Sequence, residues 1–400
     1  MKNFVFISPH FPSSYWRFCL ALKNRGFRVL GIGDAPYNEL GEECRFALDE
    51  YYCCANMEEY ENEKRAVKYF EDKYGKIDYL ESNNEFWLEK DARLRSDFNI
   101  TTGPTLEDIE KYKLKSLQKK FYEKAGLKTA RYILVDTLEN AIKFVEEVGY
   151  PVFTKPDNGV GAQDTHKIKS LDDLKSWFVT KSPNKIYIME EYVDGQIISF
   201  DGITNSKADV IFATSNVFIN DNSQIVAEGL DDMYYCVPKV DDTLMEMGKK
   251  AIKAFDVRNR FFHLEWFVLK HDHPYLGKKG TIVPLEANMR PAGAYTPDLI
   301  NYANSVNCYE IYADSIAYDE NRCDMNYTKY YACASGRRNS FKYVHNLDEI
   351  LQKYHNNVCY YGNYPQALRD DMGDTFVMAK FNTLDELMEF DNFVREKVKE

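Results

Sequence analysis

Two short strand-like runs near the middle of the chain carry the side chains with the most specific chemistry. The first reads HLEWFVL, residues 263 to 269, and the second reads GTIVPLEANMRPAG, residues 280 to 293. Because side chains alternate between the faces of a strand, Glu286 and Asn288 share one face of the second run. If the runs pair as a hairpin, Glu265 can face Glu286, and two like charges so placed need a cation between them. Carboxylate and amide oxygens in this number suit Mg²⁺, which completes its coordination with water and substrate phosphates. The hairpin therefore predicts phosphate chemistry.

Three residues beside this hairpin bear on the prediction. Arg290 follows closely, and a guanidinium next to a magnesium site can hold a carboxylate or neutralise charge on a transferred phosphoryl group. The alternative for Arg290 is an ordinary ion pair with one of the two glutamates. His263 falls on the same face as Glu265, where a half-buried histidine is favoured over a partner of the metal site. Pro284 is unusual inside a strand, because proline belongs at sheet edges or bulges.

Lys155 ends another strand-like run and leads into the loop PDNGVGAQDT, residues 156 to 165. Gly159, Gly161 and Ala162 allow backbone N–H groups to approach a ligand closely, and such donors beside an ammonium form a phosphate cradle. The lysine precedes the glycines, so this is not a Walker motif. Taken alone, the segment is also compatible with an ordinary turn that carries a surface lysine.

The run IYIMEEYV, residues 186 to 193, is an apolar strand that ends in two acids. Glu190 can accept a hydrogen bond from an adenine amino group, while backbone atoms near Tyr192 and Val193 can meet the purine edge. A solvated strand end is the simpler interpretation of the same residues.

The composition limits the classes of function. The 400 residues contain 51 Lys and Arg against 63 Asp and Glu, a net charge of −12, which disfavours a general affinity for nucleic acid or anionic membranes. The nine cysteines include no C-x-x-C pair, as is typical of reduced thiols in a cytosol, and no Cys/His cluster has zinc-ligand spacing. No apolar stretch approaches the roughly 18 residues of a membrane span. We expect a soluble cytoplasmic protein of two or three domains.

The elements that position these residues form two kinds of unit. The first hundred residues alternate strands and helices, which favours a small parallel sheet of doubly wound type. Gly31 and Gly33 follow a strand there, but the full G-x-G-x-x-G pattern is absent, which argues against a nicotinamide site. A new unit begins near residue 105, and a tail from about residue 323 has the pattern of a small α+β lobe. Helices are expected at 16–24, 61–74, 106–125, 138–148, 171–178, 244–255 and 298–303.

Taken in order, these motifs resemble the ATP-grasp superfamily, and most of all its carboxylate–amine ligases and their carbamoyl-phosphate-synthase-like relatives. The resemblance covers essentially the whole chain and rests on the co-occurrence of the motifs. It implies a mixed α/β and α+β fold with a doubly wound pre-ATP-grasp domain, a two-lobed ATP clamp and a small C-terminal α+β lobe. The implied ranges are 1–104 for the first domain, 105–194 for the small lobe with the glycine loop, 195–322 for the large lobe with the metal site, and 323–400 for the C-terminal lobe.

The resemblance also implies roles for the motif residues. The ATP phosphates would be contacted by two lysines and a glycine flap, namely Lys115, Lys155, Gly159, Gly161 and Ala162. Adenine would be held at the hinge between the lobes by Glu190, Glu191 and Val193. The metal ligands would be Glu265, Glu286 and Asn288, and the catalytic residues Arg290 and Lys155.

One position departs from the family pattern. Relatives often place a ribose-binding glutamate shortly after the hinge glycine, where this chain has Ile197. Gln196 or Asp201 is the candidate substitute, so the ribose contact is left open.

The activity implied by the resemblance uses ATP with Mg²⁺, or Mn²⁺, and two small-molecule substrates. A carboxylate, with amino acids among the candidates, attacks the γ-phosphate to give an acyl phosphate, and an amine then displaces phosphate. A closing glycine loop would keep water away from the acyl phosphate. The product nucleotide is ADP. A bicarbonate-using carboxylase or carbamoyl-phosphate-type enzyme and a non-catalytic nucleotide-binding module are the alternatives. Family analogy adds a homodimer, with no nucleic acid or membrane partner.

Overall fold

A four-stranded parallel sheet opens the chain, in the order β3-β2-β1-β4. The structure is a computed structural model that describes residues 1–159, 164–220, 225 and 228–398. The first strand reads NFVFI and is buried throughout, as expected of a parallel strand covered on both faces. The doubly wound unit predicted for the first hundred residues is therefore confirmed. Its strands are β1 (Asn3–Ile7), β2 (Arg28–Gly33), β3 (Glu50–Cys53) and β4 (Tyr79–Glu81), and its helices are α1 (Trp16–Asn24), α2 (Glu42–Ala47), α3 (Tyr60–Tyr74) and α4 (Leu88–Asp97), with a 3-10 turn at Tyr37–Glu39.

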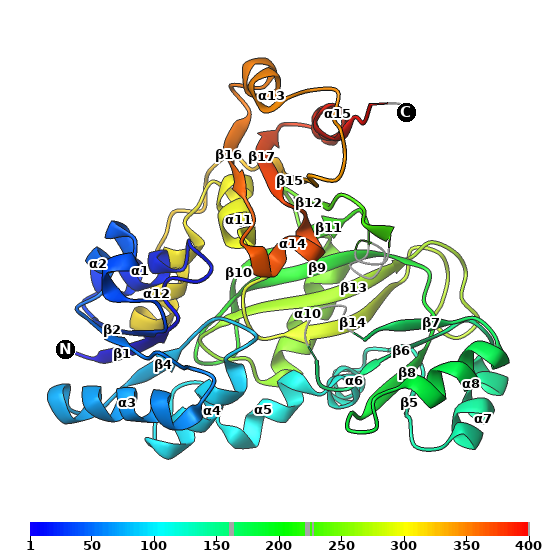
Figure 1. Ribbon diagram of the computed structural model, residues 1–400, viewed down its shortest axis with the longest axis horizontal. Helices are drawn as coiled ribbons and strands as arrows, with labels where there is room; N and C mark the ends of the chain where they lie inside the picture. The colour runs from blue at the N-terminus through cyan, green and yellow to red at the C-terminus, as the bar shows by residue number, and fades with distance from the viewer. Residues whose placement is uncertain (160–163, 221–224, 226–227, 399–400) are drawn as a thin grey trace.

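A second, antiparallel sheet has the order β5-β8-β6-β7. Helices α7 and α8 cover its outer face, on the right of Figure 1, where Phe144 and Trp177 pack against buried strand residues such as Tyr187. The glycine loop of the sequence connects β6 to β7, two strands that pair with each other. The elements are α5 (Leu106–Lys113), α6 (Lys115–Lys124), β5 (Tyr132–Leu134), α7 (Leu138–Val148), β6 (Val152–Pro156), β7 (His166–Ile168), α8 (Leu171–Thr180) and β8 (Tyr187–Glu191).

The helix expected at residues 106–125 is wrong as a single element, because it breaks at Leu114. That residue is extended, with φ −85° and ψ 114°. The carboxylate of Asp157 accepts hydrogen bonds from the backbone N of Ser116 at 2.7 Å and from its hydroxyl at 2.8 Å. Asp157 therefore caps a new helix, α6, from a distant part of the chain. The break places Lys115 in the first turn of α6.

The third sheet has nine strands and forms the largest part of the molecule. Eight of them run in the order β14-β13-β9-β11-β12-β15-β17-β16, and β10 pairs with β9. The strands are β9 (Gly195–Thr204), β10 (Val210–Thr214), β11 (Asn216–Phe218), β12 (Met233–Cys236), β13 (Phe261–Leu269), β14 (Ile282–Asn288), β15 (Tyr331–Arg337), β16 (Val358–Asn363) and β17 (Thr375–Phe381). The helices are α10 (Asp242–Phe255), α11 (Thr296–Asn304), α12 (Cys308–Tyr318), α13 (Leu347–Lys353), α14 (Arg369–Met372) and α15 (Leu384–Arg395), with a 3-10 turn at Gln366–Leu368.

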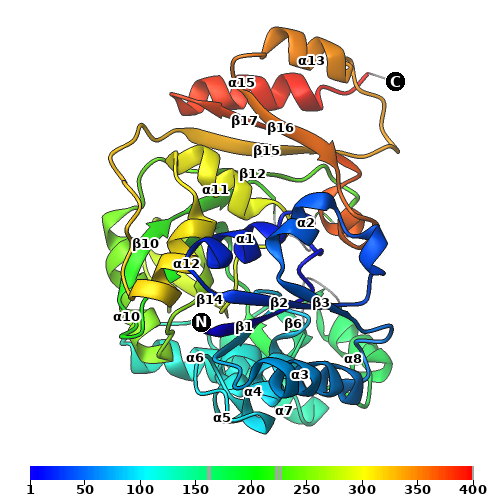
Figure 2. The same ribbon diagram turned by 90° about the vertical axis from the view of Figure 1, so that its left-hand side faces the viewer.

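The C-terminal segment shares this sheet with the preceding segment. Strand β12 pairs with β15 from Met233 opposite Ser335 to Cys236 opposite Ala332. Figure 2 shows β15, β16 and β17 with α13 and α15 at one end of the molecule. The α+β character expected after residue 323 is present, but its strands extend the large sheet. Alternation of apolar residues marks a strand without specifying its partner.

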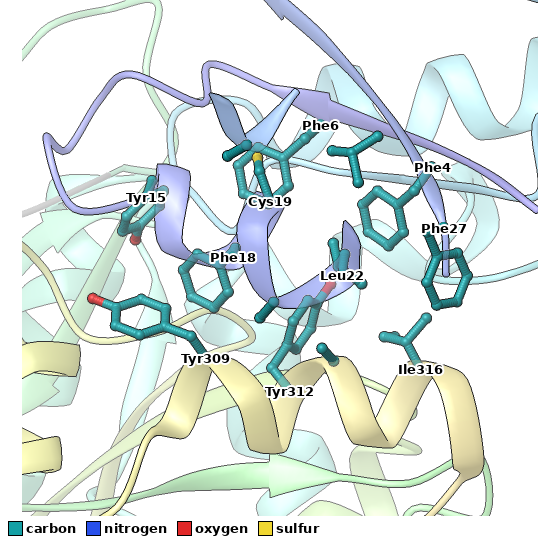
Figure 3. Packing of buried hydrophobic residues seen from close by; sticks show 14 of the residues in the cluster. Phe4, Phe6, Tyr15, Phe18, Cys19, Leu22, Phe27, Tyr309, Tyr312 and Ile316 are labelled. Carbon is teal, nitrogen blue, oxygen red and sulfur yellow. The ribbon is translucent and has the colours of Figure 1, made fainter. Parts of the chain in front are cut away.

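Helix α12, which the sequence pattern did not predict, joins the N-terminal unit to the large sheet. Figure 3 shows α1 lying along α12, with Phe18 between the two helices. The Phe18 ring lies 4.7 Å from Tyr309 and 5.3 Å from Tyr312, and 5.7 Å from Phe261 of β13. This aromatic contact places the N-terminal sheet beside the large sheet. Among the helices of the described residues, none combines the length and apolar character that a bilayer-spanning segment needs.

Candidate active site

The hairpin predicted from the sequence is formed by β13 and β14. Glu265 lies directly opposite Glu286, and His263 lies opposite Asn288. The register then shifts, so that Trp266 is opposite Pro284 and the strand bulges between Pro284 and Glu286. Strand β14 is also the edge of the sheet. Both facts explain how a proline is accommodated here. The prediction that the two carboxylates face each other is confirmed.

A cavity of about 280 Å³ gathers the predicted residues. It lies between the sheet of β6 and β8 and the large sheet, with walls contributed by β9, β13 and β14. Two predicted residues of the glycine loop, Gly161 and Ala162, lie outside the described residues. The predicted residues that line the cavity are Lys115, Lys155, Gly159, Glu190, Glu191, Val193, Glu265, Glu286, Asn288 and Arg290.

Lys115 reaches the cavity from the first turn of α6. Its Nζ atom donates to the carbonyl oxygen of Gly159 at 3.1 Å and lies 3.3 Å from Oε1 of Glu286. The buried ammonium therefore bridges the start of the glycine loop and the hairpin. In this position it can exchange a carboxylate partner for a phosphate oxygen.

Glu190 lies between two lysines. Lys155 contacts Oε2 of Glu190 at 2.9 Å, and Lys119 forms a close ion pair with Oε1. Burial raises the pKa of the Glu190 carboxyl, but the two ammonium groups outweigh it and lower the pKa to about 2. Each carboxylate oxygen of Glu190 therefore already has a cationic partner, in the place where an adenine amino group was expected.

Lys119 is a cavity residue that the sequence analysis missed. It is 3 % exposed and follows Lys115 by one helical turn, so both ammonium groups leave the same face of α6. That spacing was the available signal. Without the helix break at Leu114, however, the sequence does not show which face of this charged helix is buried.

The other hinge residues have different surroundings. Arg131 binds the Glu191 carboxylate through Nε at 2.9 Å and through a terminal nitrogen at 2.7 Å. Val193 packs among apolar residues that include Leu269 and Val283. The carboxylate of Glu191 is thus already paired with Arg131, and both Glu191 and Tyr192 line the cavity.

Glu265 is held from behind by His263. The Nε2 atom of His263 lies 3.1 Å from Oε1 of Glu265, and its Nδ1 atom lies 2.5 Å from Oδ1 of Asp201. Burial lowers the pKa of His263, but Asp201 and Glu265 outweigh it and raise the pKa to about 9. The expectation of a half-buried histidine without a site partner is therefore wrong.

The two candidate ribose contacts have different surroundings. Asp201 is 2 % exposed and is bound to His263, Ser199 and Asn216, so it does not line the cavity. Gln196 does line it, as does Ile197. The lining also has apolar residues besides Ile197, among them Phe218, Ile219, Phe267, Pro284 and Leu285.

Arg290 pairs with neither hairpin glutamate. Its Nε atom donates to Oε2 of Glu85 at 3.1 Å, and Lys113 donates to Oε1 of Glu85 at 2.7 Å. Burial raises the pKa of the Glu85 carboxyl, and the opposing effect of Arg290 and Lys113 leaves that pKa below its usual value. Glu85 follows β4 of the N-terminal sheet and lines the cavity. The alternative interpretation, in which Arg290 forms an ion pair with a hairpin glutamate, is therefore wrong.

The donor set of the hairpin fits a hard divalent cation. It comprises two opposed carboxylates and the amide of Asn288, which all border the cavity. Within the described part of the chain, no group of three or more His, Cys, Asp and Glu side chains could hold a metal ion. The hairpin set is not a group of that kind, because its third member is an amide. Two carboxylates with an amide oxygen match the small protein contribution that Mg²⁺ requires.

Comparison with known proteins adds sequence relatives. No protein-family model matches the chain. It is 26% identical over 180 residues to D-alanine–D-alanine ligase B of Clostridium perfringens, a match that covers 43% of this chain and 58% of that protein. It is 23% identical over 261 residues to the L-arginine-specific L-amino acid ligase of Bacillus subtilis, covering 60% of this chain and 57% of that protein. The chain thus spans less than two thirds of these curated relatives.

Solved structures match over the full length. The L-amino acid ligase of Bacillus licheniformis superposes with a TM-score of 0.73 at 14% identity, covering 100% of this chain and 99% of that one. The N5-carboxyaminoimidazole ribonucleotide synthetase of Thermotoga maritima superposes with a TM-score of 0.69 at 17% identity, covering 100% of both chains. The chain has the ATP-grasp fold and is related in sequence to the carboxylate–amine ligases of the ATP-grasp superfamily.

Proposed function

We propose that this protein is an ATP-dependent, ADP-forming ligase that joins a small carboxylic acid to an amine through an acyl phosphate. One observation carries the proposal. Three lysines of the unit built on the β5-β8-β6-β7 sheet, together with two opposed carboxylates and an arginine of the large sheet, line a single cavity. Phosphoryl transfer depends mainly on positioning and on neutralising negative charge, and these are the groups that supply both.

The nucleotide would lie along the cavity with its phosphates among the ammonium groups of Lys115, Lys119 and Lys155. Phosphate oxygens would take over lysine contacts that Glu190 and Glu286 provide in this structure. At the other end, the backbone of Glu191 to Val193 and the apolar side chains of Ile197 and Phe267 would enclose the base. Gln196 is the remaining candidate for the ribose.

Glu265, Glu286 and Asn288 would hold Mg²⁺, which supplies charge neutralisation to the phosphoryl group in transfer. Mn²⁺ takes the same hard oxygen ligands and is the natural substitute. The protein residues do the remaining work: Lys115 and Lys155 bind phosphate oxygens, and Arg290 holds the acid at the far side of the hairpin.

In the reaction, a carboxylate oxygen of the acid attacks the γ-phosphorus, and the bond from that phosphorus to the bridging oxygen of ADP breaks. The acyl phosphate then reacts at its carbonyl carbon with the amine, which loses a proton as phosphate leaves. Water must be excluded until the amine reacts, because it would hydrolyse the acyl phosphate.

The relatives support amino acids as substrates. One is named a D-alanine–D-alanine ligase and another an L-arginine-specific L-amino acid ligase. Among structural neighbours, the L-amino acid ligase of Bacillus licheniformis agrees, whereas others are ribonucleotide synthetases or biotin carboxylases. We therefore propose an amino acid as the acid. A homodimer through the N-terminal unit stays a prediction. Analytical ultracentrifugation tests it by measuring the mass of the protein in solution.

The test is a screen of phosphate and ADP release with Mg²⁺, ATP and amino acids in pairs. We expect release only when an acid and an amine are both present. Steady formation of AMP would contradict the proposal, and release that requires bicarbonate in place of the acid would favour the carboxylase alternative. Glu286→Ala should lower turnover by about a hundredfold or more, since the interactions lost at a metal site are worth several kcal/mol. Glu246→Ala, at an exposed glutamate of α10, is the matched control.

A further inference from the structure

We infer that His263 is a positioning residue of the proposed metal site, which orients Glu265 through one ring nitrogen while Asp201 fixes the other. The inference rests on the proposed function. Nothing in the donor set itself requires a histidine here, because hard cations such as Mg²⁺ prefer oxygen ligands. The inference rests instead on the contacts of His263 behind Glu265.

The ring of His263 is fixed by the neighbouring strands. In the β13–β9 pairing, His263 is opposite Asp201 and Glu265 is opposite Ser199. Asp201 in turn accepts hydrogen bonds from the hydroxyl of Ser199 and, at 2.8 Å, from the amide of Asn216 on β11. The carboxylate that holds Nδ1 is therefore itself held by two buried groups, so the imidazole has one orientation.

That orientation points Nε2 at one oxygen of Glu265, at 3.1 Å, from inside the sheet. His263 is 4 % exposed and does not line the cavity, so it cannot reach a ligand directly. With Oε1 held from behind, Oε2 of Glu265 is the oxygen left for a cation. Hydrogen bonds of this kind to a ligating carboxylate fix its geometry and raise metal affinity.

The opposite carboxylate has a matching restraint. Oε1 of Glu286 lies 3.3 Å from the ammonium of Lys115. Each of the two facing carboxylates thus has one oxygen engaged by a nitrogen of the protein. The two restraints differ in kind, because Lys115 is a cavity residue that a phosphate can draw away, whereas His263 is buried and stays with Glu265.

Metal binding tests the inference directly. The full-length protein is titrated with Mn²⁺ in the presence of ADP, and bound Mn²⁺ is followed by electron paramagnetic resonance. We expect His263→Ala to weaken Mn²⁺ binding by about tenfold to a hundredfold, the usual effect of losing a group that orients a metal ligand. The affinity for ADP without metal should stay within about twofold of the wild-type value, since His263 does not border the cavity. His355→Ala, at an exposed histidine, is the matched control.

Each outcome separates this inference from the proposed function. If the wild-type protein binds no Mn²⁺, the metal site of the proposed function fails. If the wild-type protein binds Mn²⁺ and folded His263→Ala binds it equally well, only the inference is overturned. If His263→Ala does not fold, Asp201→Asn decides, because it keeps the shape of the network and removes the charge that fixes the ring. Weaker Mn²⁺ binding by Asp201→Asn supports the inference, and unchanged binding overturns it.

Discussion

The Nε atom of Arg290 donates a hydrogen bond to Glu85 across 3.1 Å and so joins the end of β14 to the N-terminal parallel sheet unit. A second tie lies beside it. Arg260 donates to the backbone carbonyl of Met289 at 2.8 Å and pairs with Glu81 at 3.2 Å. Glu85 and Glu81 of the N-terminal unit therefore hold the segment after β14, Glu85 directly at Arg290 and Glu81 through Arg260 at Met289. We therefore expect changes in the N-terminal unit to affect the end of the cavity at Arg290, where the proposal places the acid.

Glu85→Gln is expected to lower kcat/KM for the acid by about tenfold to a hundredfold, because a hydrogen bond to a charged group contributes roughly 1.5 to 3 kcal/mol. The affinity for ATP should change little, since Lys115, Lys119 and Lys155 are untouched. Steady-state kinetics with varied acid at saturating ATP measures the effect. Glu246→Gln is the control, and an equal effect on the KM for ATP would show that Glu85 does not act through Arg290.

Lys119→Met should weaken ATP binding by roughly 10- to 100-fold, because the substitution removes a buried cation worth about 1.5 to 3 kcal/mol to its partner. Methionine preserves the length and apolar stem of lysine. Isothermal titration with a non-hydrolysable ATP analogue gives the affinity. Lys120→Met is the matched control, because Lys120 is exposed and neighbours Lys119 on the same helix. If the two variants bind the ATP analogue with equal affinity, Lys119 does not contribute to nucleotide binding.

Asp157→Ala is expected to destabilise the protein by about 0.5 to 2 kcal/mol, the usual cost of removing a helix cap, and also to weaken ATP binding. The second effect follows because the cap starts α6 at Lys115. Urea unfolding and an ATP titration measure the two effects. Asp241→Ala removes the cap of α10, where Asp241 accepts bonds from Thr243 and Leu244. This control variant should be less stable but bind ATP as the wild-type protein does. If Asp157→Ala also binds ATP normally, the cap of α6 does not support the ATP site.

Glu63 predicts a pH dependence of stability. Both oxygens of this side chain are buried without a hydrogen-bond partner, and it is 0 % exposed. Burial raises the pKa of Glu63 from 4.5 to about 8. Lys90 lowers this pKa and Asp91 raises it, but both effects are smaller than that of burial. Because the folded-state pKa is the higher one, the contribution is complete below pH 4.5 and is lost as pH rises towards 8.

Glu63→Gln should therefore flatten the decline in the free energy of unfolding between pH 4.5 and 8. The amide has the shape of the protonated carboxyl but does not ionise. Urea unfolding at several pH values checks the slope. A variant that shows the wild-type slope would mean that another group, such as Asp91 with its pKa raised to about 7, causes the decline.

The sequence by itself indicated the hairpin and the residue types that it brings together. Alternation along each strand puts Glu265 on one face of the first run and Glu286 on one face of the second, so the two carboxylates can meet once the runs pair. The parallel N-terminal sheet was equally readable, since buried strands such as β1 are continuous apolar runs separated by helices. Lys155 at the end of β6 followed from the same local pattern. These features depend on residues that are close in the chain.

Tertiary structure decided which groups meet the residues of the hairpin and of the cavity. The helix break at Leu114 depends on the distant residue Asp157, which caps α6. Three other contacts also join residues distant in sequence: Lys119 with Glu190, His263 with Asp201, and Arg290 with Glu85. A single strand or helix carries no signal of these contacts, because each depends on which separate segments pair or pack together. A local pattern specifies which way a side chain faces, whereas its partner is specified only when the whole core has packed.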